Sequence, residues 1–142
     1  MAVGKEFTIQ GLDELDAVLR DLPIVMQKRV ENPAVRAAAM IVKKEAEENA
    51  PVDTGQLKDN LMVKKVSGVD GQYLLGVRRP VSRRFHLTEF GTVYATAQPF
   101  VRPAIDTVGQ QAISVMVQKL HAGLMRETKK LAGKYKKSGL GR

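Results

Sequence analysis

The chain contains no cysteine and no tryptophan among its 142 residues. Disulfide bonds, thiolate nucleophiles and cysteine-bound metal centres are therefore excluded. Aromatic residues make up only 5% of the chain, so a hydrophobic core has to be built mainly from leucine, valine, isoleucine, methionine and alanine. The length suits a single domain that is large enough to bury such a core.

Long hydrophobic runs are missing as well. No stretch approaches the ~20 consecutive apolar residues that a helix needs to span a bilayer. Residues 1–6 (MAVGKE) also lack the apolar segment of a signal peptide. These absences predict a soluble product that is not exported and has no membrane partner.

Side chains that could form a catalytic or metal centre are sparse. His86 and Glu89 are a histidine–acid pair at helical spacing, but two ligands do not complete a metal site. Asp53 and Thr54 precede Gly55 without the glycine-rich spacing of a phosphate-binding loop. No serine or threonine has a base and an orienting group in its sequence context. The sequence therefore predicts no catalytic residue, no bound metal and no cofactor.

The net charge of +8 is unevenly distributed. Residues 1–62 hold 8 basic and 11 acidic side chains, so the basic excess lies in the rest of the chain. Such an excess can attract phosphate groups or acidic protein surfaces, and the alternative is a solvated surface. The basic residues form two clusters, Arg78, Arg79, Arg83 and Arg84 in the first and Lys129, Lys130, Lys134, Lys136, Lys137 and Arg142 in the second.

Apolar periodicity predicts helices in the N-terminal half. A short strand is expected at residues 7–9, and a helix over residues 11–22, where apolar residues recur on one helical face. Residues 24–49 also have a helical pattern. Pro33 leaves two possibilities for them, because it can begin a new helix or lie within one long helix.

A β-hairpin is predicted over residues 61–77, where two apolar segments flank the Asp-Gly turn at residues 70–71. Residues 78–84 are expected to form a polar loop, residues 85–90 a short helical turn, and residues 92–97 a strand or an extended loop. Residues before prolines are disfavoured in helices, so Gln98 and Arg102 are expected in extended or turn conformations. A long helix should then run from Pro103 to about residue 130.

The order of these elements predicts an α+β fold. In it, a small antiparallel sheet is packed on one face by N-terminal helices and a long C-terminal helix. One domain is expected to comprise residues 1–128. Residues 129–142 are expected to form a basic, disordered tail, because they offer little apolar surface with which to fold.

Three short motifs stand out, at residues 50–57 (APVDTGQL), 89–92 (EFGT) and 98–104 (QPFVRPA). Each joins a residue that turns the chain to an apolar anchor. Phe90 and Phe100 are expected in the core at the turns, since buried aromatic rings contribute a large apolar area. The alternative is that either ring anchors an interface with another subunit. The residues expected to shape these turns are Pro51, Gly55, Gly91, Pro99 and Pro103.

The order and spacing of these motifs resemble those of the minor tail proteins of long-tailed bacteriophages, of the tail-completion or head–tail joining type. A GLDEL segment at residues 11–15 and an alanine-rich helix before the first motif belong to the same pattern. The resemblance extends from about residue 11 to the end of the last helix. Two regions depart from it, the basic residues 78–85 and the basic residues after 126.

The resemblance implies a structural virion protein of the neck or tail, not an enzyme. It implies a homo-oligomeric ring, expected to be a hexamer, beside tail terminator, head-closure or tail-tube proteins, with DNA passing through its lumen. A ring needs contacts that close by rotation. The candidate contact residues are Asp53, Thr54, Gln56, Arg78, Arg79, Arg83, Arg84 and Glu89.

Two alternatives stay open. Glu89 can instead pair with a basic neighbour or accept backbone hydrogen bonds. The chain can also be a small basic DNA-binding protein, which its charge supports. That interpretation leaves the three motifs unexplained.

Overall fold

The computed structural model describes residues 20, 22–52, 55–79 and 81–137. The strand predicted at residues 7–9 and nearly all of the helix predicted over residues 11–22 lie outside these ranges. The described elements are α2 (Ile24–Asn49), α3 (Gln56–Asn60), β1 (Leu61–Lys65), β2 (Tyr73–Val77), α4 (Ser82–Phe90) and α5 (Val101–Lys137).

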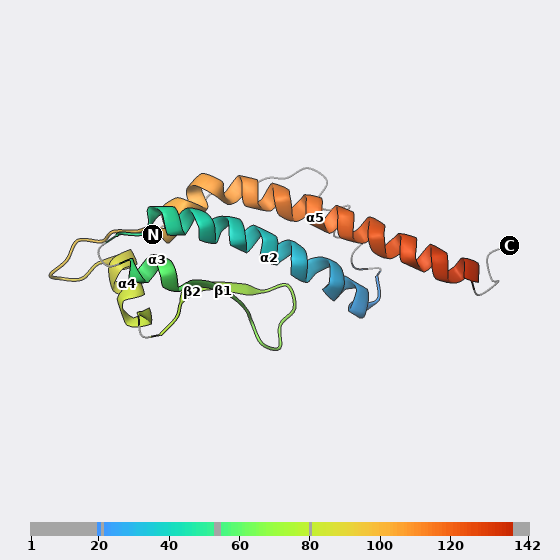
Figure 1. Ribbon diagram of the computed structural model, residues 1–142, viewed down its shortest axis with the longest axis horizontal. Helices are drawn as coiled ribbons and strands as arrows, with labels where there is room; N and C mark the ends of the chain where they lie inside the picture. The colour runs from blue at the N-terminus through green and yellow to red at the C-terminus, as the bar shows by residue number, and fades with distance from the viewer. Residues whose placement is uncertain (1–19, 21, 53–54, 80, 138–142) are drawn as a thin grey trace.

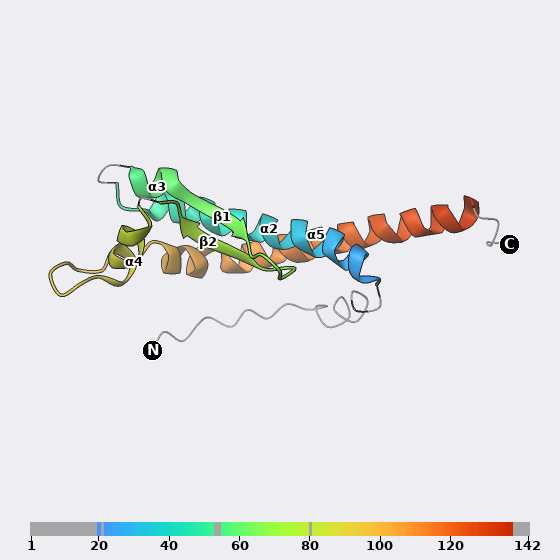
Figure 2. The same cartoon turned by 90° about the horizontal axis from the view of Figure 1, so that it is seen from below.

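Helices α2 and α5 lie side by side along the long axis and run in opposite directions (Figure 1). The β-hairpin and α4 lie on the other side of α2 from most of α5, and the last turns of α5 extend beyond α2 (Figures 1 and 2). The fold is a mostly helical α+β arrangement with a two-stranded antiparallel sheet. The predicted fold class is therefore confirmed.

Helix α2 is one continuous helix with Pro33 inside it, so the alternative of two separate helices is wrong. The helix ends at Asn49. Ala50 adopts an extended conformation at its C-terminus, as expected for a residue that precedes a proline.

Among the described residues, most of the buried hydrophobic side chains form two clusters between α2 and its neighbours. The first joins Val30 and Ala34 of α2 to Leu120 and Leu124 of α5. Close approach of the two helices there depends on Gly123, because a Cβ atom at this position would lie 3.1 Å from Cγ1 of Val30. The second cluster combines residues from α2, β1 and the start of α5, namely Ala46, Ala50, Leu61, Phe100 and Ala104.

The hairpin pairs β1 with β2 as predicted, with Leu61 opposite Val77 and Val63 opposite Leu75. Its turn is bound to the N-terminal half of α2. Asp70 accepts a hydrogen bond from Lys65 at 3.0 Å and forms an ion pair with Lys28 at 2.9 Å. The ion pair with Lys28 ties the hairpin turn to α2, whereas the bond from Lys65 lies within the hairpin.

Low pH is expected to weaken the interactions of Asp70 with Lys28 and Lys65. Hydrogen bonds from Lys28 and Lys65 lower the pKa of Asp70 from 3.8 to about 2. A carboxyl group with a lowered folded-state pKa stabilises the fold above its unfolded pKa and stops doing so as the pH falls through the folded pKa. We expect the protection factors of the β1–β2 amides, which are corrected for the intrinsic pH dependence of hydrogen exchange, to fall between about pH 4 and pH 2. The D70N variant should show faster exchange at neutral pH without this acid step, whereas D59N, at an exposed position of α3, should behave as the parent.

Residues 92–97 form a loop, so of the two alternatives predicted for them the loop is confirmed and the strand is not. Predicted boundaries of α4 and α5 were wrong. Residues 78–84 are not a polar loop throughout, because Arg83 and Arg84 lie in α4, which begins at Ser82. Helix α5 begins at Val101, so Arg102 is helical and not in an extended or turn conformation. The helix ends at Lys137 instead of near residue 130.

The early start of α5 has a physical reason. Pro103 occupies the first turn, where a backbone N–H has no partner within the helix and its absence costs little. The N–H groups just before it bind a carboxylate, as described below. The predicted division of the chain at residues 128 and 129 stays a prediction.

Candidate assembly site at the α4–α5 end

The three motifs, far apart in the sequence, meet at one end of the molecule. Ala50 of the first motif lies in the same buried cluster as Phe100 and Ala104 of the third. The backbone N–H of Gln98 donates a 2.8 Å hydrogen bond to the carbonyl of Thr88, next to the second motif. The Phe100 ring also meets the Phe85 ring of α4 edge to face, at 5.7 Å between centroids. The motifs therefore build one structural unit.

Glu89 is at the centre of this unit. Its side chain is buried, and its two carboxylate oxygens accept hydrogen bonds from the backbone N–H groups of Phe100 at 2.8 Å, Val101 at 3.2 Å and Arg102 at 3.1 Å. The first N–H groups of a helix lack intrahelical partners, and the helix dipole favours negative charge there. A side chain of α4 thus caps the N-terminus of α5.

This geometry decides between the interpretations of Glu89. The predicted backbone hydrogen bonds are confirmed, and the Nε atom of Arg102 lies 3.9 Å from the same carboxylate. The Glu89 carboxylate is buried and its oxygens are bonded within the chain, so its role in a contact between subunits stays a prediction. His86 is exposed, and among the residues that the structure describes no group of three or more acidic or histidine side chains could hold a metal ion.

Phe90 and Phe100 have opposite environments. Phe100 is fully buried, whereas 63% of Phe90 is exposed, so the expectation that both are core residues is wrong for Phe90. Successive helical residues point about 100° apart, so Phe90 turns outward when Glu89 points inward. The guanidinium group of Arg102 lies over the Phe90 ring, 4.4 Å from its centroid.

Gly91 shapes the exit from α4. Its backbone has φ 76° and ψ 176°, a conformation that is nearly exclusive to glycine. A Cβ atom there would lie 2.7 Å from the backbone nitrogen of Ala97. Both the conformation and the close approach therefore require glycine.

We expect G91A to destabilise the protein by about 2–3 kcal/mol, since backbone strain and the clash with Ala97 add. The matched control is G68A in the hairpin turn. Gly68 also has a positive φ of 79°, but a Cβ atom there would meet nothing within 4 Å. G68A should therefore lower the free energy of unfolding by only about 1 kcal/mol, from backbone strain alone. Equal losses for the two variants in urea denaturation would contradict the steric role of Gly91.

Residues 92–97 form a protruding loop between α4 and α5, which we call the 92–97 arm (Figures 1 and 2). Its turn is ordered by Thr92, whose hydroxyl oxygen accepts hydrogen bonds from the N–H groups of Tyr94 at 3.2 Å and Ala95 at 3.0 Å. The N–H of Thr92 donates to the Ala95 carbonyl at 2.9 Å. At the tip, 96% of Val93 and 98% of Tyr94 are exposed.

A cavity of about 190 Å³ lies between the first motif and α4. We call it the Gly55 cavity. No sequence pattern predicted this cavity, because its walls come from three segments that lie far apart in the sequence. It is lined by Pro51, Gly55, Gln56, Leu57, Val81, Arg84, Thr88 and Gln98.

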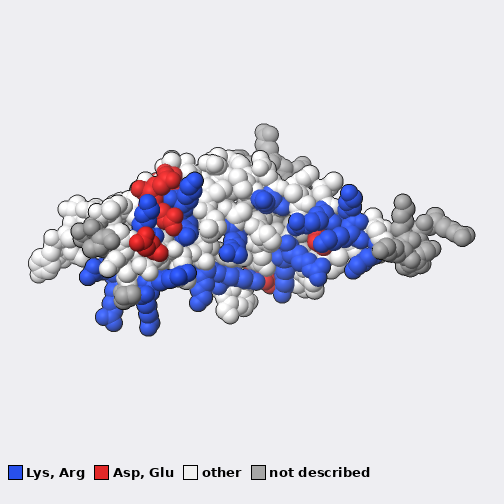
Figure 3. Space-filling model, viewed as in Figure 1, with Lys and Arg blue, Asp and Glu red and all other residues white. Residues whose placement is uncertain are grey.

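Of the predicted contact residues, Gln56 and Arg84 thus lie at one cavity, while Asp53 and Thr54 lie outside the described ranges. All four arginines of the first basic cluster are exposed. In Figure 3, basic side chains gather along the edge formed by the hairpin and α4. The structure therefore presents these arginines to a partner or to solvent.

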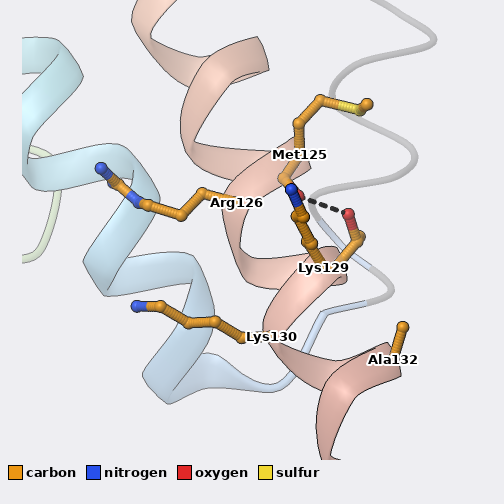
Figure 4. A pocket seen from close by; sticks show the side chains of 6 residues that line it. Met125, Arg126, Lys129, Lys130 and Ala132 are labelled. Atoms are coloured by element: carbon orange, nitrogen blue, oxygen red, sulfur yellow. Dashed lines mark hydrogen bonds between the residues drawn. The ribbon is translucent and has the colours of Figure 1, made fainter.

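A shallow, open surface depression lies along the C-terminal part of α5, and Arg126, Lys129 and Lys130 line it (Figure 4). Arg126 and Lys130 extend on the side of α5 that faces α2, whereas Lys129 runs along α5 towards Met125. Glu127 is buried nearby, 3.3 Å from Lys130 and 3.9 Å from Arg29. Because α5 extends to Lys137, the lysines of the second basic cluster up to that residue are helical.

Comparison with known protein families agrees with the sequence motifs. Residues 13–91 match the family described as "Bacteriophage HK97-gp10, putative tail-component". The matched region is more than half of the chain and includes the first motif and most of the second. This match identifies the chain as a bacteriophage tail component.

The chain belongs to the HK97 gp10-like family, and the resemblance to phage tail proteins is confirmed. No curated protein and no solved structure matched the chain. Within the described ranges, no helix is long and apolar enough to cross a membrane.

Proposed function

We propose that this phage tail component is a ring-forming tail-completion or head–tail joining protein. It connects the tail to the capsid by assembly and not by catalysis. The observation that carries the proposal is the convergence of three motifs at one end, where they build a braced arm and a cavity.

The proposed ring has six copies and closes through contacts between two different surfaces of the same chain. Its proposed contact residues are Gln56, the exposed arginines of the first basic cluster, and Asp53 and Thr54, which lie outside the described ranges. The proposed neighbours are the tail terminator, a head-closure protein or the tail tube. The chain assembles in the host cytoplasm, and DNA passes through the lumen of the ring.

The test is mass photometry of the purified chain, alone and mixed with candidate tail terminator, head-closure and tube proteins. A discrete ring or a stoichiometric complex supports the proposal. Phage that lack the chain should accumulate separate heads and tails, and addition of the purified protein should restore joined particles. Normal joining without the chain would overturn the proposed role.

A DNA-binding protein is the second candidate, favoured by the exposed arginines at the edge of the hairpin and α4 (Figure 3). It predicts duplex binding that weakens linearly with the logarithm of salt concentration, with a smaller slope in the R83A/R84A variant. A chain that binds duplex DNA tightly but none of the tail proteins would favour this function.

A further inference from the structure

We propose that Tyr94 at the tip of the 92–97 arm inserts into the Gly55 cavity of a second copy of this chain. This inference rests on the proposed ring and identifies the contact that would close it. It assigns the Tyr94 side chain of one copy to the Gly55 cavity of another copy.

The arm is built to project an apolar tip. Single exposed hydrophobic residues are ordinary on protein surfaces, but Val93 and Tyr94 are adjacent and almost completely exposed. The arm is held at both ends, by Gly91 packed closely on Ala97 and by the hydrogen bond from Gln98 to Thr88. An arm that is already ordered loses little conformational entropy when it binds.

The cavity fits the side chain in size and chemistry. A cavity of about 150 Å³ can hold a benzene molecule, so about 190 Å³ accommodates the phenol ring of Tyr94. Leu57 and Val81 supply apolar wall, while Gln56, Arg84 and Thr88 supply groups that can bond the hydroxyl. Tyrosines with a buried ring and a bonded hydroxyl are typical anchors of protein interfaces.

Charge favours a second copy over another occupant. Residues 91–101 (GTVYATAQPFV) contain no charged side chain. The arm can therefore approach a chain of net charge +8 without the repulsion that two basic surfaces would meet. An acidic partner would instead be matched by the exposed arginines. Because the arm and the cavity are different surfaces of one chain, their contact is heterologous and can propagate around a ring.

The absence of native cysteine allows a direct test by disulfide cross-linking. The full chain carrying V93C, which keeps Tyr94, is mixed with the full chain carrying Q56C at the cavity and oxidised mildly. We expect a covalent heterodimer on a non-reducing gel. Two controls should give about tenfold less heterodimer: V93C/Y94A mixed with Q56C, and V93C mixed with K119C at an exposed site on α5.

Tyr94 is almost entirely exposed, so Y94A should leave the circular dichroism spectrum and the unfolding midpoint unchanged. Equal heterodimer yields in all three mixtures would overturn the arm–cavity contact. The proposed function is tested separately, by the presence of the chain in purified particles and by restored head–tail joining. Particles that contain the chain while cross-linking is unspecific would refute the contact alone. Specific cross-linking with no incorporation into particles would refute the proposed function alone.

Discussion

F100A is expected to destabilise the protein by about 3–5 kcal/mol, the range typical of a buried phenylalanine replaced by alanine. Phe100 is fully buried in the cluster that joins α2, β1 and α5, and its ring packs edge to face against Phe85. Domains of this size have unfolding free energies of about 5–15 kcal/mol. We therefore expect urea denaturation followed by circular dichroism to show a large loss of stability.

The matched control is F90A, which removes the same side chain ten residues earlier. Phe90 is 63% exposed, and its defined contact is with the Arg102 guanidinium. Loss of this cation–π contact should cost about 0.5–1 kcal/mol. A similar loss of stability in the two variants would contradict the placement of Phe100 in the core and of Phe90 on the surface.

The hairpin was predictable because its signals are local. Alternating apolar residues and an Asp-Gly turn lie within residues 61–77, and the structure pairs them in one antiparallel sheet. The start of α4 was not predicted, because the sequence has no local signal for it. Val81 precedes the helix without a side-chain cap, so the sequence carried no start signal and the arginines read as a loop.

The start of α5 could not be predicted from local sequence. Pro103 indicated a helix nearby, but the first turn begins two residues earlier because Glu89 of α4 binds its N–H groups. That contact spans more than ten residues and depends on how α4 packs. The same packing buries Phe100 and exposes Phe90. From the sequence both were expected in the core, because each lies next to a residue that turns the chain.

The candidate site was predictable only in part. The motifs at residues 50–57, 89–92 and 98–104 marked the right end of the molecule, because turn residues and apolar anchors have recognisable patterns. The Gly55 cavity and the exposed tip of the 92–97 arm depend on the three-dimensional arrangement of distant segments. The spacing of residues in the sequence does not indicate which apolar side chains remain exposed to solvent.

E89A is expected to cost about 3 kcal/mol, because three backbone N–H groups lose a charged acceptor in a buried environment. The loss should concentrate at the first turn of α5. We expect hydrogen exchange at Val101 and Arg102 to accelerate far more than exchange in the middle of α2. Because α5 begins beside the arm, cross-linking through Val93 should also fall.

A second pair of variants separates capping from simple burial of a carboxylate. Glu89 and Glu127 are both buried, but Oε2 of Glu127 has no hydrogen-bond partner among the described residues. E89Q places an amide NH₂ group against backbone donors and should cost about 2 kcal/mol. E127Q loses only ion pairs to the exposed side chains of Arg29 and Lys130 and should cost less than about 1 kcal/mol. Equal unfolding free energies for E89Q and E127Q would show that Glu89 does not stabilise α5 as a cap.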